Sequence, residues 1–157
     1  MSGERRLPIS LVLAALACTA PAVRPHYGPL PATAIDTLAI QPESVIVVLA
    51  SRLTEAGLRV RRSSPAEGYL ETDWFALRAR RPVSPDHVQT DRVVRVRVWA
   101  DPEPPGRSRV VVETVYRRTA DPSAPGREEE IVAPPGHPGD SLTQHLLRDL
   151  RGGGDRR

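Results

Sequence analysis

The sequence predicts a single α+β domain in which an antiparallel sheet of four to five strands carries two helices on one face. Two segments repeat apolar residues at helical spacing, and four segments alternate apolar with polar or charged residues at the spacing of a strand. Stretches rich in proline, glycine and charge separate them. The elements follow in the order β-α-β-β-β-β-α, in which most strands succeed one another directly, and this order favours antiparallel pairing.

The first strand is predicted over residues 34–40, and a helix follows it over residues 42–56. Pro42 suits the first helical position, and Gly57 suits the position after the last turn. Between them the apolar residues recur every three or four positions, at Val45, Leu49, Leu53 and Ala56.

The next two strands are predicted over residues 58–61 and 69–77, with a turn rich in serine, proline and glycine between them. The alternation in the second of these strands places Leu70, Thr72 and Trp74 on one side of the sheet. Residues 78–91 are polar, contain two prolines and are predicted to form a loop.

Two valine-rich strands are predicted over residues 92–100 and 108–118, and the prolines of residues 101–107 predict a loop that no strand crosses. Asp140 is expected to cap the last helix, and residues 152–157 are expected to form a disordered tail. The apolar stripe of that helix consists of Leu142, Leu146 and Leu150.

The opposite side of this sheet is predicted to be charged and solvated. Its opposite charges face one another across strands, and each such pair contributes roughly 0.2–1 kcal/mol to the stability of the sheet. Arginines outnumber acids there, so an alternative is a face that binds an acidic partner or a lipid headgroup. The residues expected on this side are Arg59, Arg61, Glu71, Asp73, Arg95, Arg97, Arg109, Glu113 and Arg117.

Composition limits the function. The chain has 157 residues, 39% hydrophobic and 26% charged, which suits one folded domain. The net charge of +3 is small and spread evenly, which argues against nucleic-acid binding. A single cysteine excludes a disulfide scaffold, and the composition excludes a membrane protein with several spans.

Residues 1–17 have the pattern of an export signal. Arg5 and Arg6 precede an apolar stretch of eleven residues, which as a helix spans about 16 Å, too short to cross a membrane. The end of this stretch, Leu-Ala-Ala-Leu-Ala-Cys, resembles a bacterial lipobox, although Ala15 and Leu16 stand in the reverse of the preferred order. The resemblance implies that Cys18 is lipidated, with acyl chains such as palmitate, and that the chain is cut before it.

Two alternatives remain open for Cys18. One is an ordinary secretory signal cut after Ala17 or Ala20, and the other is a buried cysteine in the cytosol. Residues 18–32, with the lipidated cysteine and four prolines, are predicted to form an extended tether before a domain over residues 33–151. Thr19 follows the cysteine, and by resemblance to the enterobacterial sorting rule this predicts the outer membrane, facing the periplasm.

The search for catalytic or metal-binding residues predicts no enzyme, no cofactor and no metal site. Residues 139–142 spell Gly-Asp-Ser-Leu, the motif of a serine hydrolase family, but only sixteen residues follow Ser141 and no Asp-x-x-His lies among them. The four histidines, at positions 26, 87, 137 and 145, have no metal-ligand spacing.

Residues 48–74 contain a helix that ends in Glu-Ala-Gly, a Leu-Arg-Val strand, a turn at glycine and a Thr-Asp-Trp strand. This unit resembles the repeating domain of the outer-membrane assembly lipoprotein BamC and of many small bacterial lipoproteins. The resemblance implies a helix-grip α+β form without enzymatic activity, and it implies that Trp74 is a core residue under the helix.

Together these observations predict an envelope lipoprotein with a binding or scaffolding role, in outer-membrane assembly or maintenance, held by its lipid and contacting an envelope protein. The alternative is a periplasmic carrier that holds a small apolar ligand between sheet and helix. A pocket lined by Val48, Val94, Val98 and Val112 would favour the carrier, and close packing there would favour the scaffold.

Overall fold

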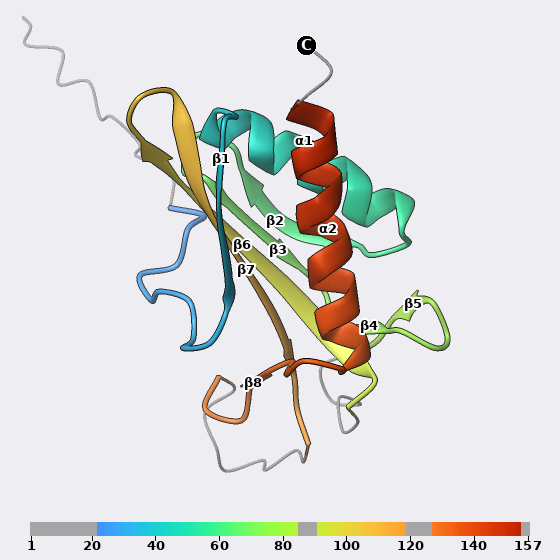
Figure 1. Cartoon of the computed structure of the whole chain (residues 1–157). Coiled ribbons are helices and arrows are strands. Elements are labelled where there is room, and N and C mark those ends of the chain that lie inside the picture. Colours follow the sequence, from blue (N-terminus) through green and yellow to red (C-terminus); the bar gives the residue numbers. More distant parts are fainter. Residues whose placement is uncertain (1–21, 85–90, 119–126, 155–157) are drawn as a thin grey trace, which may run out of the picture.

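Figure 1 shows the computed structural model of the chain, in which residues 22–84, 91–118 and 127–154 are described. These residues form two helices and a sheet of eight strands. Five strands make up the body of the sheet in the order β1-β7-β6-β3-β2, and each neighbouring pair is antiparallel. The predicted α+β class with an antiparallel sheet is confirmed.

The strands of the main sheet are β1 (Ala34–Leu38), β2 (Val60–Ser64), β3 (Tyr69–Thr72), β6 (Val93–Glu103) and β7 (Arg107–Tyr116). Three strands of two residues each are added to it, namely β4 (Phe75–Ala76), β5 (Arg81–Pro82) and β8 (Ile131–Val132). Because α1 carries the chain across the sheet, β1 and β2 lie at opposite edges (Figure 1).

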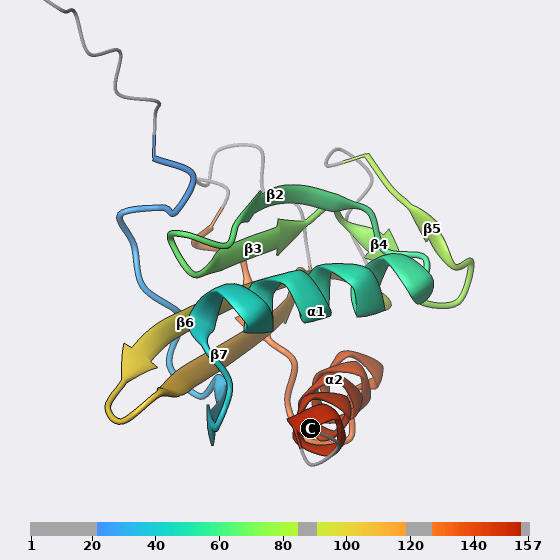
Figure 2. The same ribbon diagram turned by 90° about the horizontal axis from the view of Figure 1, so that it is seen from above.

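The helices α1 (Pro42–Glu55) and α2 (Pro138–Gly154) both pack on one face of the sheet, as predicted (Figure 2). Burial of a Val, Leu or Ile side chain contributes roughly 1.5–3 kcal/mol, so the aliphatic core between the layers holds the fold together. Its main members are Val45, Ile46, Leu49 and Leu53 of α1, Leu146, Leu147 and Leu150 of α2, and Val96, Val98, Val110 and Val112 of the sheet.

The loop predicted over residues 101–107 is instead the end of a long hairpin. β6 continues to Glu103, β7 starts at Arg107, and Pro102 is paired with Ser108. The neighbouring strand β3 begins at Tyr69, which pairs with Trp99, so β6 has an open edge beyond this point. Proline is tolerated on an open edge because its missing N–H interrupts no ladder there.

The strand predicted over residues 69–77 is interrupted by a bulge. Glu71 pairs with Arg97 and Phe75 pairs with Val94, so four steps along one strand match three along the other. The extra residue reverses the alternation, as bulges do. Trp74 therefore lies on the outer side of the sheet and not under the helix, which corrects the position implied by the resemblance to BamC-type units.

The start and the end of α2 also differ from prediction. The imidazole Nδ1 of His137 accepts the backbone N–H of Gly139 at 2.9 Å and so caps the helix, whereas Asp140 lies within the first turn. The helix continues to Gly154, so residues 152–154 are not part of a disordered tail, and residues 155–157 lie outside the described chain.

Gly68 is required by the turn between β2 and β3. Its φ of +61° is in the left-handed region, and a Cβ built there would lie 2.0 Å from the carbonyl oxygen of Ala100. The backbone N–H of Ala100 donates to the carbonyl of Gly68 at 2.8 Å. Only glycine allows the turn to approach β6 this closely.

Candidate functional site

The centre of the outer face of the sheet is covered by two segments, which corrects the prediction of a solvated face there, whereas Arg59, Arg61 and Arg109 at its margins are exposed as predicted. The N-terminal strap, defined here as residues 22–32, packs Val23 on Tyr69 and Trp99. Leu30 of the strap and Val132 of β8 pack on the small apolar cluster around Trp74. Figure 2 shows the strap on the side of the sheet opposite the helices.

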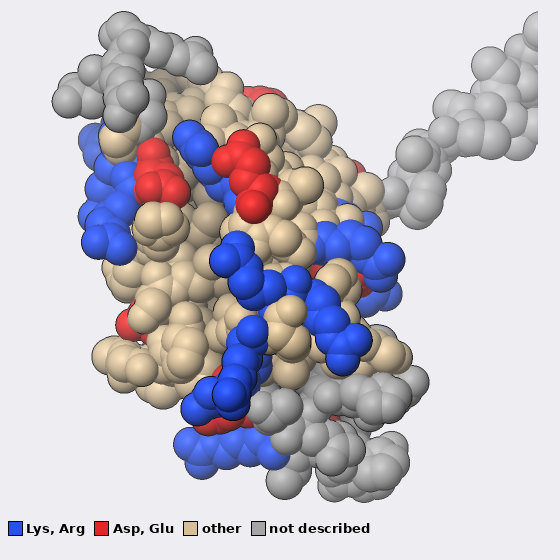
Figure 3. Space-filling view, turned by 90° about the vertical axis from the view of Figure 1, so that its right-hand side faces the viewer, with Lys and Arg blue, Asp and Glu red and all other residues tan. Residues whose placement is uncertain are grey.

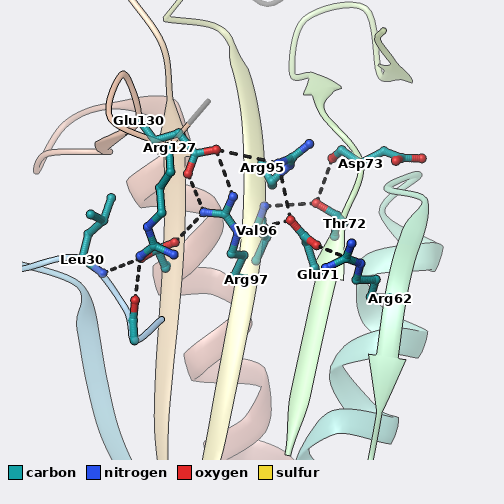
Figure 4. A network of polar contacts seen from close by, with 12 residues as sticks. Leu30, Arg62, Glu71, Thr72, Asp73, Arg95, Val96, Arg97, Arg127 and Glu130 are labelled. Atoms are coloured by element: carbon teal, nitrogen blue, oxygen red, sulfur yellow. Dashed lines mark hydrogen bonds and ion pairs between the residues drawn. The ribbon is translucent and has the colours of Figure 1, made fainter. Parts of the chain in front are cut away.

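Beneath these segments lies a buried charge network, which consists of Glu71 on β3, Arg95 and Arg97 on β6, Glu113 on β7 and Glu130 just before β8 (Figure 4). All five residues are buried, and Glu113 is 0% exposed. Buried charges are tolerated only when they are paired and hydrogen-bonded. The geometry of this network therefore decides whether the strap and β8 stay packed on the sheet.

Arg97 is the centre of the network. Its Nη1 lies 2.7 Å from Glu113 Oε1 and 2.6 Å from Glu130 Oε2, and its Nη2 lies 2.9 Å from Glu130 Oε1. Its Nε donates to Glu71 at 3.2 Å. One guanidinium thus joins three carboxylates from three segments, and its contact with Glu130 is bidentate, the strongest form of this ion pair.

Glu113 connects the network to the strap. Its Oε2 accepts the backbone N–H of Leu30 at 2.6 Å and lies 3.2 Å from Arg127 Nη2. The same nitrogen of Arg127 donates to the carbonyl of Gly28 at 2.6 Å. Tyr27 completes this junction, because the guanidinium of Arg127 lies 3.9 Å from its ring centre and that of Arg97 lies 5.8 Å from it.

Trp74 supports the other end of the network. The guanidinium carbons of Arg95 and Arg117 lie 4.5 and 5.0 Å from its ring centre. Arg95 also lies 3.4 Å from Glu71 and 3.7 Å from Glu130, at the distance of ion pairs without close hydrogen bonds. The indole thus supplies the cation–π contact that two partly desolvated guanidiniums need.

Burial and neighbouring charge shift the pKa values of this region in opposite directions. Burial lowers the pKa of Arg95, against the effect of Glu71. Burial also acts to lower the pKa of Arg97, but hydrogen bonds and charges from Glu130 and Glu113 outweigh it, so the pKa of Arg97 is raised. Burial, followed by the charge of Glu71, raises the pKa of Tyr69, which therefore stays protonated.

The strap begins at a second fixed point. The carboxylate of Glu67, in the turn between β2 and β3, accepts the backbone N–H groups of Val23 and Arg24. Arg24 in turn forms an ion pair with Asp101 at 2.8 Å. Residues 22–32 are therefore bound along the sheet, which corrects the prediction of an extended tether there, and residues 18–21 lie outside the described chain.

We expect the variant Glu67→Ala to release the start of the strap without unfolding the domain. The carboxylate holds two backbone amides at a half-exposed position, and its loss is expected to cost about 1 kcal/mol. Hydrogen exchange of the Val23 and Arg24 amides should become faster, while the melting temperature changes little. The matched variant Glu55→Ala, on the exposed side of α1, should leave both amides unchanged.

The structure does not bring the other candidate residues together. Cys18 and His87 lie outside the described residues, and His26 is exposed. Ser141 is exposed on α2, and His145 on the same helix faces Asp149 at 3.7 Å. In the described part of the chain, no three His, Cys, Asp or Glu side chains are grouped as metal ligands.

Two cavities, of about 180 and 250 Å³, border the described segments. The smaller one is lined by residues of the strap end, β7 and α2, including Ala32, Val112, Thr114 and Thr143. Both are below the size of about 300 Å³ at which small-molecule sites begin. Of the four valines expected around an apolar ligand, only Val112 borders either cavity.

The sequence signals for this site are partial. Glu71, Arg95, Arg97 and Glu113 belong to the charged side of the sheet that alternation predicts. Tyr27, Glu67, Arg127 and Glu130 come from segments that are rich in proline, glycine or charge, and such composition does not indicate which strand a segment covers.

Neither helix of the described chain is both long and apolar enough to span a membrane. The sequence matches no known protein-family model, and no curated protein is significantly similar to it.

Proposed function

We propose that this protein is a lipid-anchored lipoprotein of the bacterial cell envelope with a non-enzymatic binding or scaffolding role. The observation that carries the proposal is the stretch from Leu7 to Cys18, an apolar segment after two arginines that ends in the only cysteine of the chain. Lipidation would also remove the reactive thiol that a lone cysteine presents in an exported protein.

The strap supports a close association of the domain with its anchor. Three residues separate Cys18 from Ala22, the first described residue, and the four Cα–Cα steps between them span at most roughly 14 Å. Val23 and Arg24 are already bound to Glu67. A lipid on Cys18 would thus hold the domain directly at the membrane surface, not at the end of a long tether.

The packing favours scaffolding over the alternative of a carrier for an apolar ligand. Val94, Val98 and Val112 are at most 1% exposed, and the helices fill the space over this face of the sheet. On the other face, the carboxylates and guanidiniums of the buried charge network bind one another. The side chains on both faces of the sheet are thus occupied by contacts within the domain. The binding role is therefore assigned to the exposed surface.

The variant Cys18→Ser tests the anchor. The protein is expected to leave the membrane fraction and to lose incorporation of labelled palmitate, because the serine hydroxyl does not accept the diacylglycerol that the thiol accepts. The variant Ser141→Ala, at an exposed hydroxyl on α2, should behave as the unchanged protein does. Unchanged fractionation and labelling of Cys18→Ser would contradict the proposal.

A further inference from the structure

A group of arginines lies along one edge of the sheet, where β2 and the β4–β5 hairpin meet. The start of β2 and the hairpin adjoin, because a Cβ on Gly57, three residues before β2, would lie 3.7 Å from the Phe75 ring of β4 and 4.0 Å from the carbonyl of Arg80. All six side chains are exposed, and Figure 3 shows arginines across this side of the molecule. This arginine edge consists of Arg59, Arg61, Arg62, Arg78, Arg80 and Arg81.

Most of the positive charge of the arginine edge is uncompensated. Arg59 is paired with Asp73, and Arg62 lies 3.8 Å from Glu71, which already faces Arg95 and Arg97. The other four arginines form no ion pair within the described residues. These four guanidiniums therefore leave a cluster of uncompensated positive charge at this edge.

Protection of an open strand explains only part of this group. Charged residues on an edge strand oppose pairing with a second chain, and Arg61 and Arg62 on β2 serve that purpose. Arg78, Arg80 and Arg81 belong to the β4–β5 hairpin and not to β2. Protection of β2 therefore does not explain why these three arginines are present. A planar guanidinium matches the oxygens of a phosphate group in a bidentate manner, which makes arginine the preferred residue for phosphate.

The arginine edge begins close to the point where the chain enters the domain. Glu67, which binds Val23 and Arg24, lies in the turn that joins β2 to β3, and the five residues of β2 extend about 17 Å from it. Figure 2 shows the start of the described chain, β2 and β5 along one side of the molecule, with α1 across the middle and α2 on the far side. An anchor at Cys18 and the arginine edge can therefore reach the same flat surface.

We infer that the arginine edge lies against the phosphate headgroups of anionic lipids in the membrane that carries the anchor. The inference rests on the proposed lipoprotein function. Lipidation confines the domain to the membrane surface, so even a weak attraction between guanidinium and phosphate is enough to orient it. Helix α2 then faces away from the membrane and remains open to other partners.

Vesicle binding of the unlipidated full chain tests this inference. The Cys18→Ser protein is mixed with phosphatidylcholine vesicles that contain either no or one-third phosphatidylglycerol, and the bound fraction is measured by sedimentation. We expect at least tenfold tighter binding to the anionic vesicles, weakened by salt. Adding Arg61→Gln, Arg80→Gln and Arg81→Gln together should lower the anionic binding constant on the order of 100-fold.

A matched triple variant separates the arginine edge from net charge. Arg107→Gln, Arg109→Gln and Arg148→Gln remove the same charge from exposed positions elsewhere, and should lower binding less than about threefold. Thermal melting of each variant confirms that it is folded. Equal losses for the two triple variants, or equal binding to neutral and anionic vesicles, would overturn the inference.

Soluble polyglutamate distinguishes a lipid from an acidic protein as the partner. If the chain binds polyglutamate through these arginines but shows no preference for anionic vesicles, the partner is an acidic protein segment and the inference is wrong. Because the test protein carries no lipid, its result is independent of whether Cys18 is the anchor in cells. The fractionation of Cys18→Ser tests the anchor separately.

Discussion

Replacing Arg97 by methionine is expected to lower the free energy of unfolding by about 3–5 kcal/mol. The guanidinium is 2% exposed and joins Glu71, Glu113 and Glu130, so its removal leaves three buried carboxylates short of a partner. Total stabilities of domains are about 5–15 kcal/mol, so this single loss removes a large share. Chemical denaturation followed by circular dichroism measures it.

Two further variants test whether the lost stability comes from buried carboxylates that are left without an ion-pair partner. Arg97→Lys keeps the positive charge but not the bidentate contact with Glu130, and should lose less than Arg97→Met. Combining Arg97→Met with Glu130→Leu removes both partners of one pair, and should cost at least about 1 kcal/mol less than the two single losses added together. Full additivity would show that the residues act independently.

Trp74→Ala is expected to destabilise the domain by about 3–5 kcal/mol, as usual for a buried aromatic residue. The indole is 1% exposed, and its loss leaves a cavity beside Val93 and Val115 as well as two guanidiniums without their ring contact. The melting temperature and the denaturation midpoint measure the change.

Trp74→Phe is the control for the ring contact with the two guanidiniums. The phenyl ring keeps a face for Arg95 and Arg117, so the loss should be well below that of alanine. Because Trp74 lies on the outer side of the sheet, Trp74→Ala should increase hydrogen exchange in the strap near Leu30 more than in α1. The reverse order would place the indole under the helix.

The regular elements could be predicted because their signals are local. Helix α1 depends on Pro42 at its start, Gly57 after its end and apolar spacing between them, and the structure ends it one residue before the prediction. The face of β6 that contacts the helices, with Val96 and Val98, follows from strict alternation. Alternation also predicted on which side Arg95 and Arg97 lie, because that period continues without interruption along β6.

The bulge near Trp74 and the hairpin end at Pro102 could not be predicted in this way. A bulge is one extra residue relative to a partner strand, so it exists only in the pairing of Glu71 with Arg97 and of Phe75 with Val94. Likewise, Pro102 is accepted because β3 ends short of it, and the lengths of two strands distant in sequence decide that.

The sequence by itself determined the α+β class, both helices and the sidedness of the central strands, because each depends on residues that are neighbours along the chain. Only the tertiary structure decided that the centre of the charged side of the sheet is buried. That outcome depends on Tyr27, Leu30, Arg127 and Glu130, which reach the sheet from irregular segments. Such segments have no periodicity, and the free energy of their contacts arises only when distant carboxylates and guanidiniums meet.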